Sequence, residues 1–85
     1  MTELLKAFRW VVVGRPGCGY CDKAKDLLNK NEIPFTYLDL TEYPDLAVFL
    51  KASSMETVPQ VFANGSNVGG FRETKEVIQV HGGVV

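Results

Sequence analysis

The first half of the chain alternates between strand-like apolar runs and a helix-like apolar stripe. FRWVVV at 8–13 is β-branched and aromatic and ends at the turn-forming GRPG, which predicts a buried strand. Over 18–28 the apolar residues recur at helical spacing between charged ones, which predicts an amphipathic helix that ends near NKNE. FTYLDL at 35–40 predicts a second strand. A βαβ unit of this kind requires two parallel strands and a right-handed crossover.

The second half predicts a helix, a hairpin and a closing helix. PDLAVFLKASS at 44–54 has a proline near the helix start and apolar residues at helical spacing. PQVFANGSNVGG at 59–70 contains Asn64-Gly65, a strong hairpin signal because both residues tolerate positive φ. Apolar spacing around 74–78 predicts the last helix, which ends at HGG. The order β-α-β-α-β-β-α therefore predicts one α/β domain over 1–85, with a four-stranded mixed sheet and three helices.

Composition narrows the class of protein. The chain has 85 residues, 46% of them hydrophobic, which is ordinary for a globular domain and enough for one modest core. The net charge is −1 and no basic block is present, so we expect neither a nucleic-acid partner nor a membrane surface. The longest apolar run, WVVV, is too short for a membrane span or a signal-peptide core. A reducing cytoplasm is therefore the expected compartment.

The two cysteines, Cys18 and Cys21, form a CxxC pair at the start of the predicted first helix. In a reducing compartment such a pair is typical of a redox or metal site more than of a permanent staple. A bridge closing so short a loop also adds little stability through chain entropy. A zinc site needs four ligands, whereas the only histidine, His81, is remote and continues an apolar helix face. The pair is best interpreted as a reactive dithiol, with a shared metal ligand and a staple as alternatives.

The two sulfurs are predicted to differ in reactivity. Cys18 falls in the first helical turn, where unpaired N–H groups and the positive end of the helix dipole favour a thiolate. Such positions lower a cysteine pKa from about 8.5 to roughly 3.5–7.5. Arg15, three residues upstream, can add positive charge. Cys21 lies one turn further in, so we expect Cys18 to be the nucleophile and Cys21 the resolving cysteine.

Two further segments carry weaker signals. In ETVPQVF at 56–62, Pro59 opens an apolar strand, and a proline there favours an edge strand. A cis Val58–Pro59 bond is the alternative, but only about 5–6% of X–Pro bonds are cis. Gly69-Gly70 permits a tight turn into the last helix, whose N–H groups could bind a carboxylate. A plain turn is the simpler interpretation.

Taken in order, RPGCGYC, TVPQVFANG and VGGF resemble the glutaredoxins, small oxidoreductases with the thioredoxin fold. The resemblance covers nearly the whole chain. It implies that glutathione serves as reductant for protein disulfides and for glutathionylated proteins. Ribonucleotide reductase is a common client in the family, although nothing in the sequence singles it out. The resemblance also implies a monomer in the apo form.

The resemblance assigns roles to individual residues. Cys18 would accept the glutathionyl group and Cys21 would serve dithiol chemistry. Pro59 would be cis, so that the backbone of Val58 pairs with the cysteinyl unit of glutathione. Arg15 would take the place of the usual lysine at the glycine carboxylate. The full set of glutathione-binding residues implied is Arg15, Tyr20, Thr57, Val58, Pro59, Gly70, Phe71 and Arg72.

Three departures from the family pattern define the alternatives. Gly19 replaces the proline of CPYC, and some relatives with a small residue there bind a [2Fe-2S] cluster at a dimer interface, with Cys18 as the protein ligand. The chain would then be an iron–sulfur carrier or sensor. Arg72-Glu73 replaces an acidic pair, so Glu73 alone could pair with the γ-glutamyl ammonium. The helix over 44–53 shows no obvious polar residue to assist at the glycine carboxylate. A thioredoxin-like protein fed by a reductase is a third interpretation.

Overall fold

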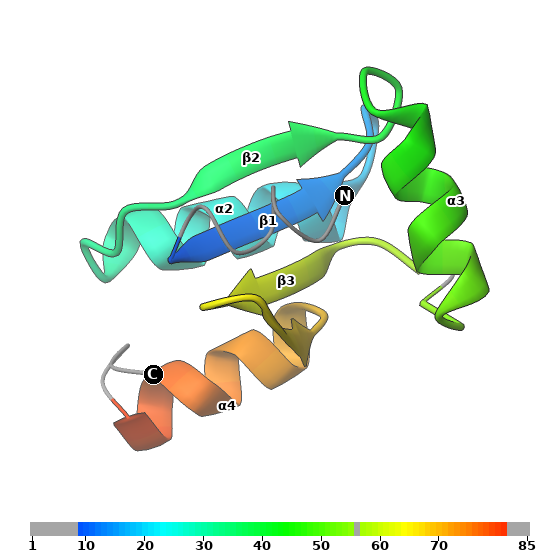
Figure 1. Cartoon of the computed structure of the whole chain (residues 1–85). Helices are drawn as coiled ribbons and strands as arrows, with labels where there is room; N and C mark the ends of the chain where they lie inside the picture. Colours follow the sequence, from blue (N-terminus) through cyan, green and yellow to red (C-terminus); the bar gives the residue numbers. More distant parts are fainter. Residues whose placement is uncertain (1–8, 56, 82–85) are drawn as a thin grey trace.

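The computed structural model describes residues 9–55 and 57–81. Its elements follow the predicted order (Figure 1). They are β1 (Trp10–Gly14), α2 (Gly19–Lys30), β2 (Thr36–Asp39), α3 (Pro44–Ala52), β3 (Gln60–Ala63), β4 (Ser66–Gly69) and α4 (Phe71–His81). The predicted hairpin turns at Asn64 and Gly65, both of which have positive φ. The closing helix reaches His81, whose side chain lies outside the described residues, as do the glycines after it.

The four strands form one mixed sheet in the order β2-β1-β3-β4. β1 pairs with β2 in parallel, with Val12 opposite Tyr37. β3 pairs antiparallel with β1 on one side and with β4 on the other. The element order and the four-stranded mixed sheet match the predicted thioredoxin-like fold class, which is confirmed.

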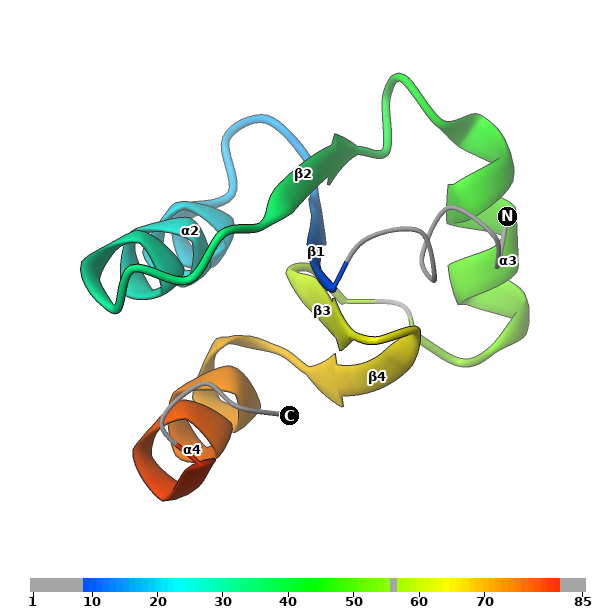
Figure 2. The same ribbon diagram turned by 60° about the vertical axis from the view of Figure 1, so that its left-hand side comes forward.

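Helices cover both faces of the sheet. α3 lies on one face and α2 and α4 on the other, as Figure 2 shows most clearly. Along β1, Val11 and Val13 join the α3-side cluster, whereas Trp10 and Val12 join the cluster that contains residues of α2 and α4. The strand reads as one apolar run because it is buried on both faces.

Several predicted boundaries differ from the structure: β2 spans Thr36–Asp39 within the predicted 35–40, and α3 spans Pro44–Ala52 within the predicted 44–54. β1 continues through Gly14, which the sequence pattern had placed in the turn, and Arg9 precedes the strand in a bend. The predicted first residue of this strand, Phe8, lies outside the described residues. The expectation that Pro59 opens an edge strand is wrong, because β3 is paired on both sides and Pro59 stands just before it.

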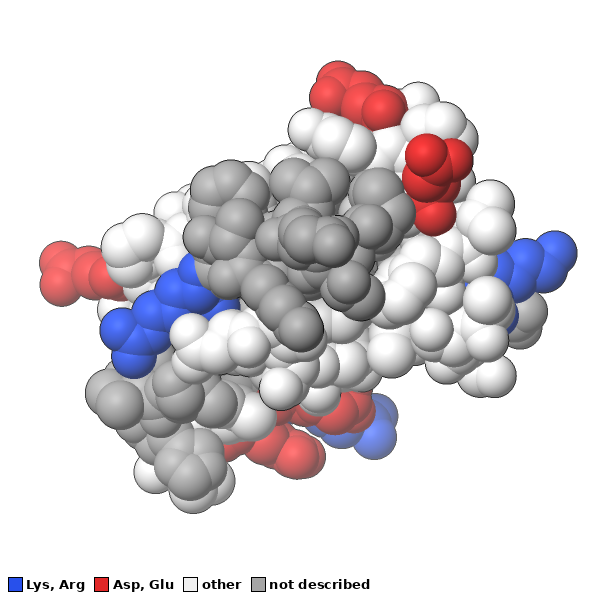
Figure 3. Space-filling model, in the orientation of Figure 1, with Lys and Arg blue, Asp and Glu red and all other residues white. Residues whose placement is uncertain are grey.

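Charges of both signs are mixed on the face drawn in Figure 3, where acidic and basic side chains lie around the periphery. Within the described part of the chain, no helix combines the length and the apolar character that crossing a bilayer requires.

Candidate active site

Cys18 is the N-cap of α2. Its φ of −94° and ψ of 108° are extended, and its sulfur accepts a hydrogen bond from the backbone N–H of Cys21 at 3.1 Å. The sulfur thus occupies the place where a helix start offers unpaired donors and positive potential. Asp22 N–H donates to the carbonyl of Cys18, which continues the first turn. A thiolate at Cys18 is the form this arrangement favours.

Cys21 lies one turn further along and is buried, with 1% of its surface exposed. The two cysteines are joined as a disulfide, with their Cα atoms 5.2 Å apart. That separation lies within the usual range for disulfides, roughly 4.4–6.8 Å. The pair is therefore asymmetric: Cys18 is partly exposed and Cys21 is enclosed by the fold.

Tyr37, on β2, lies beside the buried end of this pair. Its hydroxyl oxygen and Cys21 Sγ both lie within about 3 Å of the point that a β-carbon on Gly14 would occupy. Burial raises the pKa of the Tyr37 phenol; Lys25, whose ammonium sits 4.2 Å from the ring centroid, opposes that rise, and the charges of Asp39 and Asp22 add to it. The neutral phenol is therefore the favoured form beside Cys21.

The segment before β3 presents its backbone to Cys18. The Val58–Pro59 peptide bond is cis, and the Val58 carbonyl oxygen lies 3.8 Å from Cys18 Sγ. Thr57 is held by Gln60, whose Nε2 donates to the Thr57 carbonyl at 2.9 Å and lies 3.3 Å from its hydroxyl. Asn67 on β4 donates in turn to Gln60 Oε1 at 3.0 Å. This chain of side-chain amides holds Thr57, the residue that precedes Val58.

The start of α4 is capped from within the helix. Glu73 Oε1 accepts the Gly70 N–H at 2.8 Å, and the Thr74 hydroxyl donates to the Gly70 carbonyl at 2.8 Å. The first arrangement is the glutamate half of a capping box. The Gly70 N–H is thus already paired within the chain, and the sequence had favoured a plain turn at this position over a carboxylate site. The glutamate three residues after the cap was a sequence signal for this bond.

A groove of about 480 Å³ runs between the segment before β3 and the start of α4. Tyr20 forms one side of it, with 59% of its surface exposed and its ring centroid 6.1 Å from that of Phe71. The ammonium nitrogen of Lys23 lies over the Tyr20 ring, 4.8 Å from its centroid. Seven of the predicted glutathione-binding residues line this groove: Tyr20, Thr57, Val58, Pro59, Gly70, Phe71 and Arg72. Glu73 and Lys75 complete its lining.

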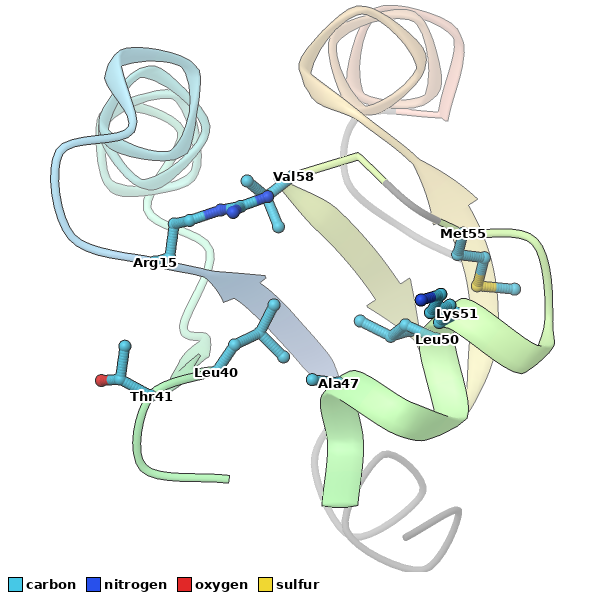
Figure 4. Close-up of a pocket in the computed structure, with 8 residues that line it drawn as sticks. All are labelled: Arg15, Leu40, Thr41, Ala47, Leu50, Lys51, Met55 and Val58. Carbon is cyan, nitrogen blue, oxygen red and sulfur yellow. The ribbon is translucent and has the colours of Figure 1, made fainter. Parts of the chain in front are cut away.

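Arg15, the eighth, lies on the other side of Val58. It follows β1 and extends toward the Val58 side chain across the mouth of a second pocket (Figure 4). Lys51 of α3 lines the same pocket, beside Leu50 and Met55 and across from Arg15 in Figure 4. The only signal in the sequence was a basic residue in the last turn of α3.

Among the described residues, no group of three or more His, Cys, Asp or Glu side chains is placed to hold a metal ion. A cluster ligated as the resemblance implies would take one sulfur, Cys18, from this chain. That alternative remains a prediction.

Comparison with known proteins agrees with this geometry. The glutaredoxin family model matches residues 10–68. Glutaredoxin-C1 of Arabidopsis thaliana is 36% identical over 87% of this chain and 62% of its own length, so the chain spans less than two thirds of that relative. Glutaredoxin 1 of Escherichia coli is 32% identical over 74% of this chain and 84% of its own length. The structure of a buckwheat glutaredoxin–glutathione complex superimposes with a TM-score of 0.81 at 27% identity, covering 96% of this chain and 77% of the other.

Proposed function

The chain belongs to the glutaredoxin family, and we propose that it uses glutathione to reduce protein disulfides and glutathione mixed disulfides. The observation that carries the proposal is the placement of Cys18: its sulfur caps α2 and lies 3.8 Å from the carbonyl oxygen of Val58, a residue that lines two pockets. The proposed nucleophilic sulfur of Cys18 thus lies next to the Val58 backbone, with which a bound peptide would pair. The cytoplasm, where glutathione is reduced, is the proposed compartment.

In the first step, the Cys18 thiolate attacks one sulfur of the substrate disulfide. A new disulfide joins Cys18 to that sulfur, and the other sulfur leaves as a thiolate that takes up a proton. When the substrate is a glutathionylated protein, the protein thiol leaves and the glutathionyl group stays on Cys18. A second glutathione then attacks this group, giving oxidised glutathione and restoring the Cys18 thiolate.

Cys21 serves the dithiol route. With a protein disulfide, Cys18 forms a mixed disulfide with the protein, and the Cys21 thiolate attacks Cys18 Sγ to release the second protein thiol. The product is the Cys18–Cys21 disulfide, the state present in the structure. Two glutathione molecules then reduce it, one forming a mixed disulfide at Cys18 and the other displacing it as oxidised glutathione.

Glutathione is proposed to lie across Val58. Its cysteinyl unit would pair with the Val58 backbone, in the manner of a short added strand. Its glycine carboxylate would meet Arg15, whose guanidinium can bind a carboxylate through two hydrogen bonds. Its γ-glutamyl end would enter the groove beside Phe71, where Arg72 and Lys75 supply positive charge and Glu73 the negative charge.

The experiment is glutathione-coupled turnover of two substrates, a glutathione–cysteine mixed disulfide and a protein disulfide, by the wild type, Cys18→Ser and Cys21→Ser. We expect Cys18→Ser to lose both activities. Cys21→Ser should keep mixed-disulfide turnover and lose reduction of the protein disulfide. If Cys21→Ser lost both, the two roles would be wrongly assigned; if the wild type turned over neither, the proposed function would fail. Visible absorption of anaerobically purified protein tests the [2Fe-2S] alternative.

A further inference from the structure

On the far side of Val58 from the groove is a second pocket, of about 420 Å³. The glycine carboxylate placed above would reach Arg15 at its mouth, and no glutathione group placed above would cover its apolar wall. The pocket lies between the end of β1, the loop after β2, α3 and the segment before β3. Its apolar wall consists of Leu40, Ala47, Leu50, Met55 and Val58, and its polar lining of Arg15, Thr41 and Lys51. In Figure 4, Leu40 and Leu50 point toward each other across this space, and Arg15 spans its mouth toward Val58.

The wall is part of the hydrophobic core, which makes the pocket preformed. Leu50 is buried in the α3-side cluster, and Leu40 and Met55 pack against that cluster. A side chain that enters therefore contacts fixed apolar groups, and it does not need to order a loop. Pockets of about 300–1,000 Å³ with an apolar wall and a few polar groups are typical binding sites.

The charged residues that line the pocket favour an acidic group at its rim. Arg15 and Lys51 both line the pocket, and within the described part of the chain no Asp or Glu does. The groove on the other side of Val58, by contrast, includes Glu73. An apolar side chain carried on an acidic segment matches this pocket in both shape and charge.

The pleat of a substrate peptide bound in extended form directs one of its side chains into this pocket. A cysteine bonded to Cys18 points to the side of the sheet where α2 begins, and successive side chains of an extended strand point to opposite faces. The neighbouring residue therefore points to the α3 side, where the residues of this pocket lie. Val58 lines both the pocket and the groove, so the two flank the residue at which the peptide backbone would pair.

Resting on the proposed function, which directs the carboxyl end of the bound peptide to Arg15, we propose that this pocket selects protein substrates with a large aliphatic side chain directly after the reacting cysteine and an acidic residue next to it. Glutathione has glycine at that position and therefore has no side chain to enter the pocket. The pocket thus separates recognition of protein disulfides from recognition of glutathione.

The test uses symmetric disulfide dimers of short peptides, so that whichever sulfur is attacked the same peptide occupies the site. One peptide contains Cys-Leu-Asp, a second Cys-Gly-Asp, and a third Leu-Cys-Gly-Asp. With the full chain we expect kcat/KM for the first to exceed that for the second about tenfold, the scale of discrimination by an apolar pocket. The third should gain nothing over the second.

Variants locate the effect. Ala47→Phe fills the pocket and should abolish the preference for leucine. If the phenylalanine ring impairs folding, Ala47→Met replaces it as the test variant and should reduce the preference. The matched control is Val48→Phe, on the same helix but outside the pocket and 68% exposed, which should keep the preference. Lys51→Gln should lower the rate with the aspartate peptide and reduce its dependence on salt.

Equal kcat/KM for the first two peptides in the wild type would overturn the proposal, as would a preference that survives both Ala47 variants. A gain only with leucine before the cysteine would overturn the assigned direction. Turnover of the glutathione–cysteine mixed disulfide is measured alongside. If that turnover is present and the preference absent, the pocket proposal alone fails, whereas absent turnover of every substrate defeats the proposed function itself.

Discussion

Cys21 Sγ lies 2.7 Å from the point that a β-carbon on Gly14 would occupy, and Cys21 Cβ lies 3.1 Å from it. The end of β1 and the first turn of α2 therefore touch at a position with no room for a methyl group. Gly14 thus leaves the room that the sulfur of Cys21, the proposed resolving cysteine, occupies against β1.

Gly14→Ala should therefore displace Cys21 and destabilise the fold by about 1–3 kcal/mol, the usual cost of overpacking a core. Reduction of protein disulfides should fall more than turnover of the glutathione mixed disulfide, because only the former requires Cys21. Chemical denaturation of the oxidised protein and the two turnover assays provide the measurements. Gly19→Ala is the control, since nothing lies within 4 Å of its β-carbon; equal effects from both alanines would contradict this account.

Glu73 has a structural and a proposed binding role that can be separated. Its carboxylate accepts the Gly70 N–H, and it is the one acidic side chain lining the groove among the residues described. Glu73→Gln keeps an oxygen that can accept that bond but removes the negative charge. We expect little change in stability and a rise of about two- to fivefold in KM for glutathione, the scale of an exposed ion pair.

Glu73→Ala should in addition cost about 1 kcal/mol by removing the cap. Thermal denaturation together with the glutathione dependence of turnover distinguishes the two roles. Glu76→Gln, an exposed change on the same helix, serves as the control. An unchanged KM in Glu73→Gln would mean that the γ-glutamyl ammonium finds its partner elsewhere.

Arg15 is the residue proposed to bind the glycine carboxylate. Arg15→Gln should raise KM for the glutathione mixed disulfide by about fivefold and leave kcat nearly unchanged, because the charge acts in binding and not in sulfur transfer. The salt dependence of kcat/KM should weaken as well. Arg15→Lys should recover part of the loss, since lysine keeps the charge but not the paired hydrogen bonds.

The control for Arg15 is Arg9→Gln, at the opposite end of β1. It changes the net charge by the same amount, so a similar rise in KM from both variants would point to a general charge effect. A fall in kcat with KM unchanged in Arg15→Gln would place the arginine in the chemical step.

The hydrophobic pattern predicted the helices and strands well because the spacing of apolar residues in each one reflects which of its faces are buried. The run WVVV is apolar throughout since β1 is buried on both faces, and Asn64-Gly65 turns the hairpin because both residues adopt positive φ. The pattern also placed Cys18 at a helix start, where it is the N-cap.

What the pattern missed depends on contacts between distant segments. Gly14 was assigned to a turn because the reason for a glycine there is Cys21 on the next element. Pro59 was expected at an edge, since nothing local shows that β3 is paired on both sides. Lys51 and Arg15 line one pocket only because of the way α3 lies across the sheet. The positions of such residues can be predicted only once the arrangement of the strands and helices is known.

Tyr37 provides a prediction for alkaline pH. Burial raises the pKa of its phenol above the ordinary value of about 10, with Lys25 opposing the rise and Asp39 and Asp22 adding to it. At a pH between that ordinary value and the higher pKa of the folded state, the phenol of the unfolded chain has lost its proton and the phenol of the folded protein keeps it. Stability falls with rising pH wherever the folded state binds more protons. The free energy of unfolding should therefore decline across this window, and Tyr37→Phe should remove that part of the decline.

Denaturation of the disulfide form from pH 9 upward avoids titration of the cysteine thiols. Phenolate absorption in the wild type minus that in Tyr37→Phe isolates the Tyr37 phenol, which should ionise above about 10. A Tyr37 signal that appears at or below that pH, or identical pH slopes for the two proteins, would contradict the assignment. Because the phenol lies beside Cys21, the same substitution should also alter the rate at which Cys21 resolves a protein mixed disulfide, measured by quenched single turnover at neutral pH.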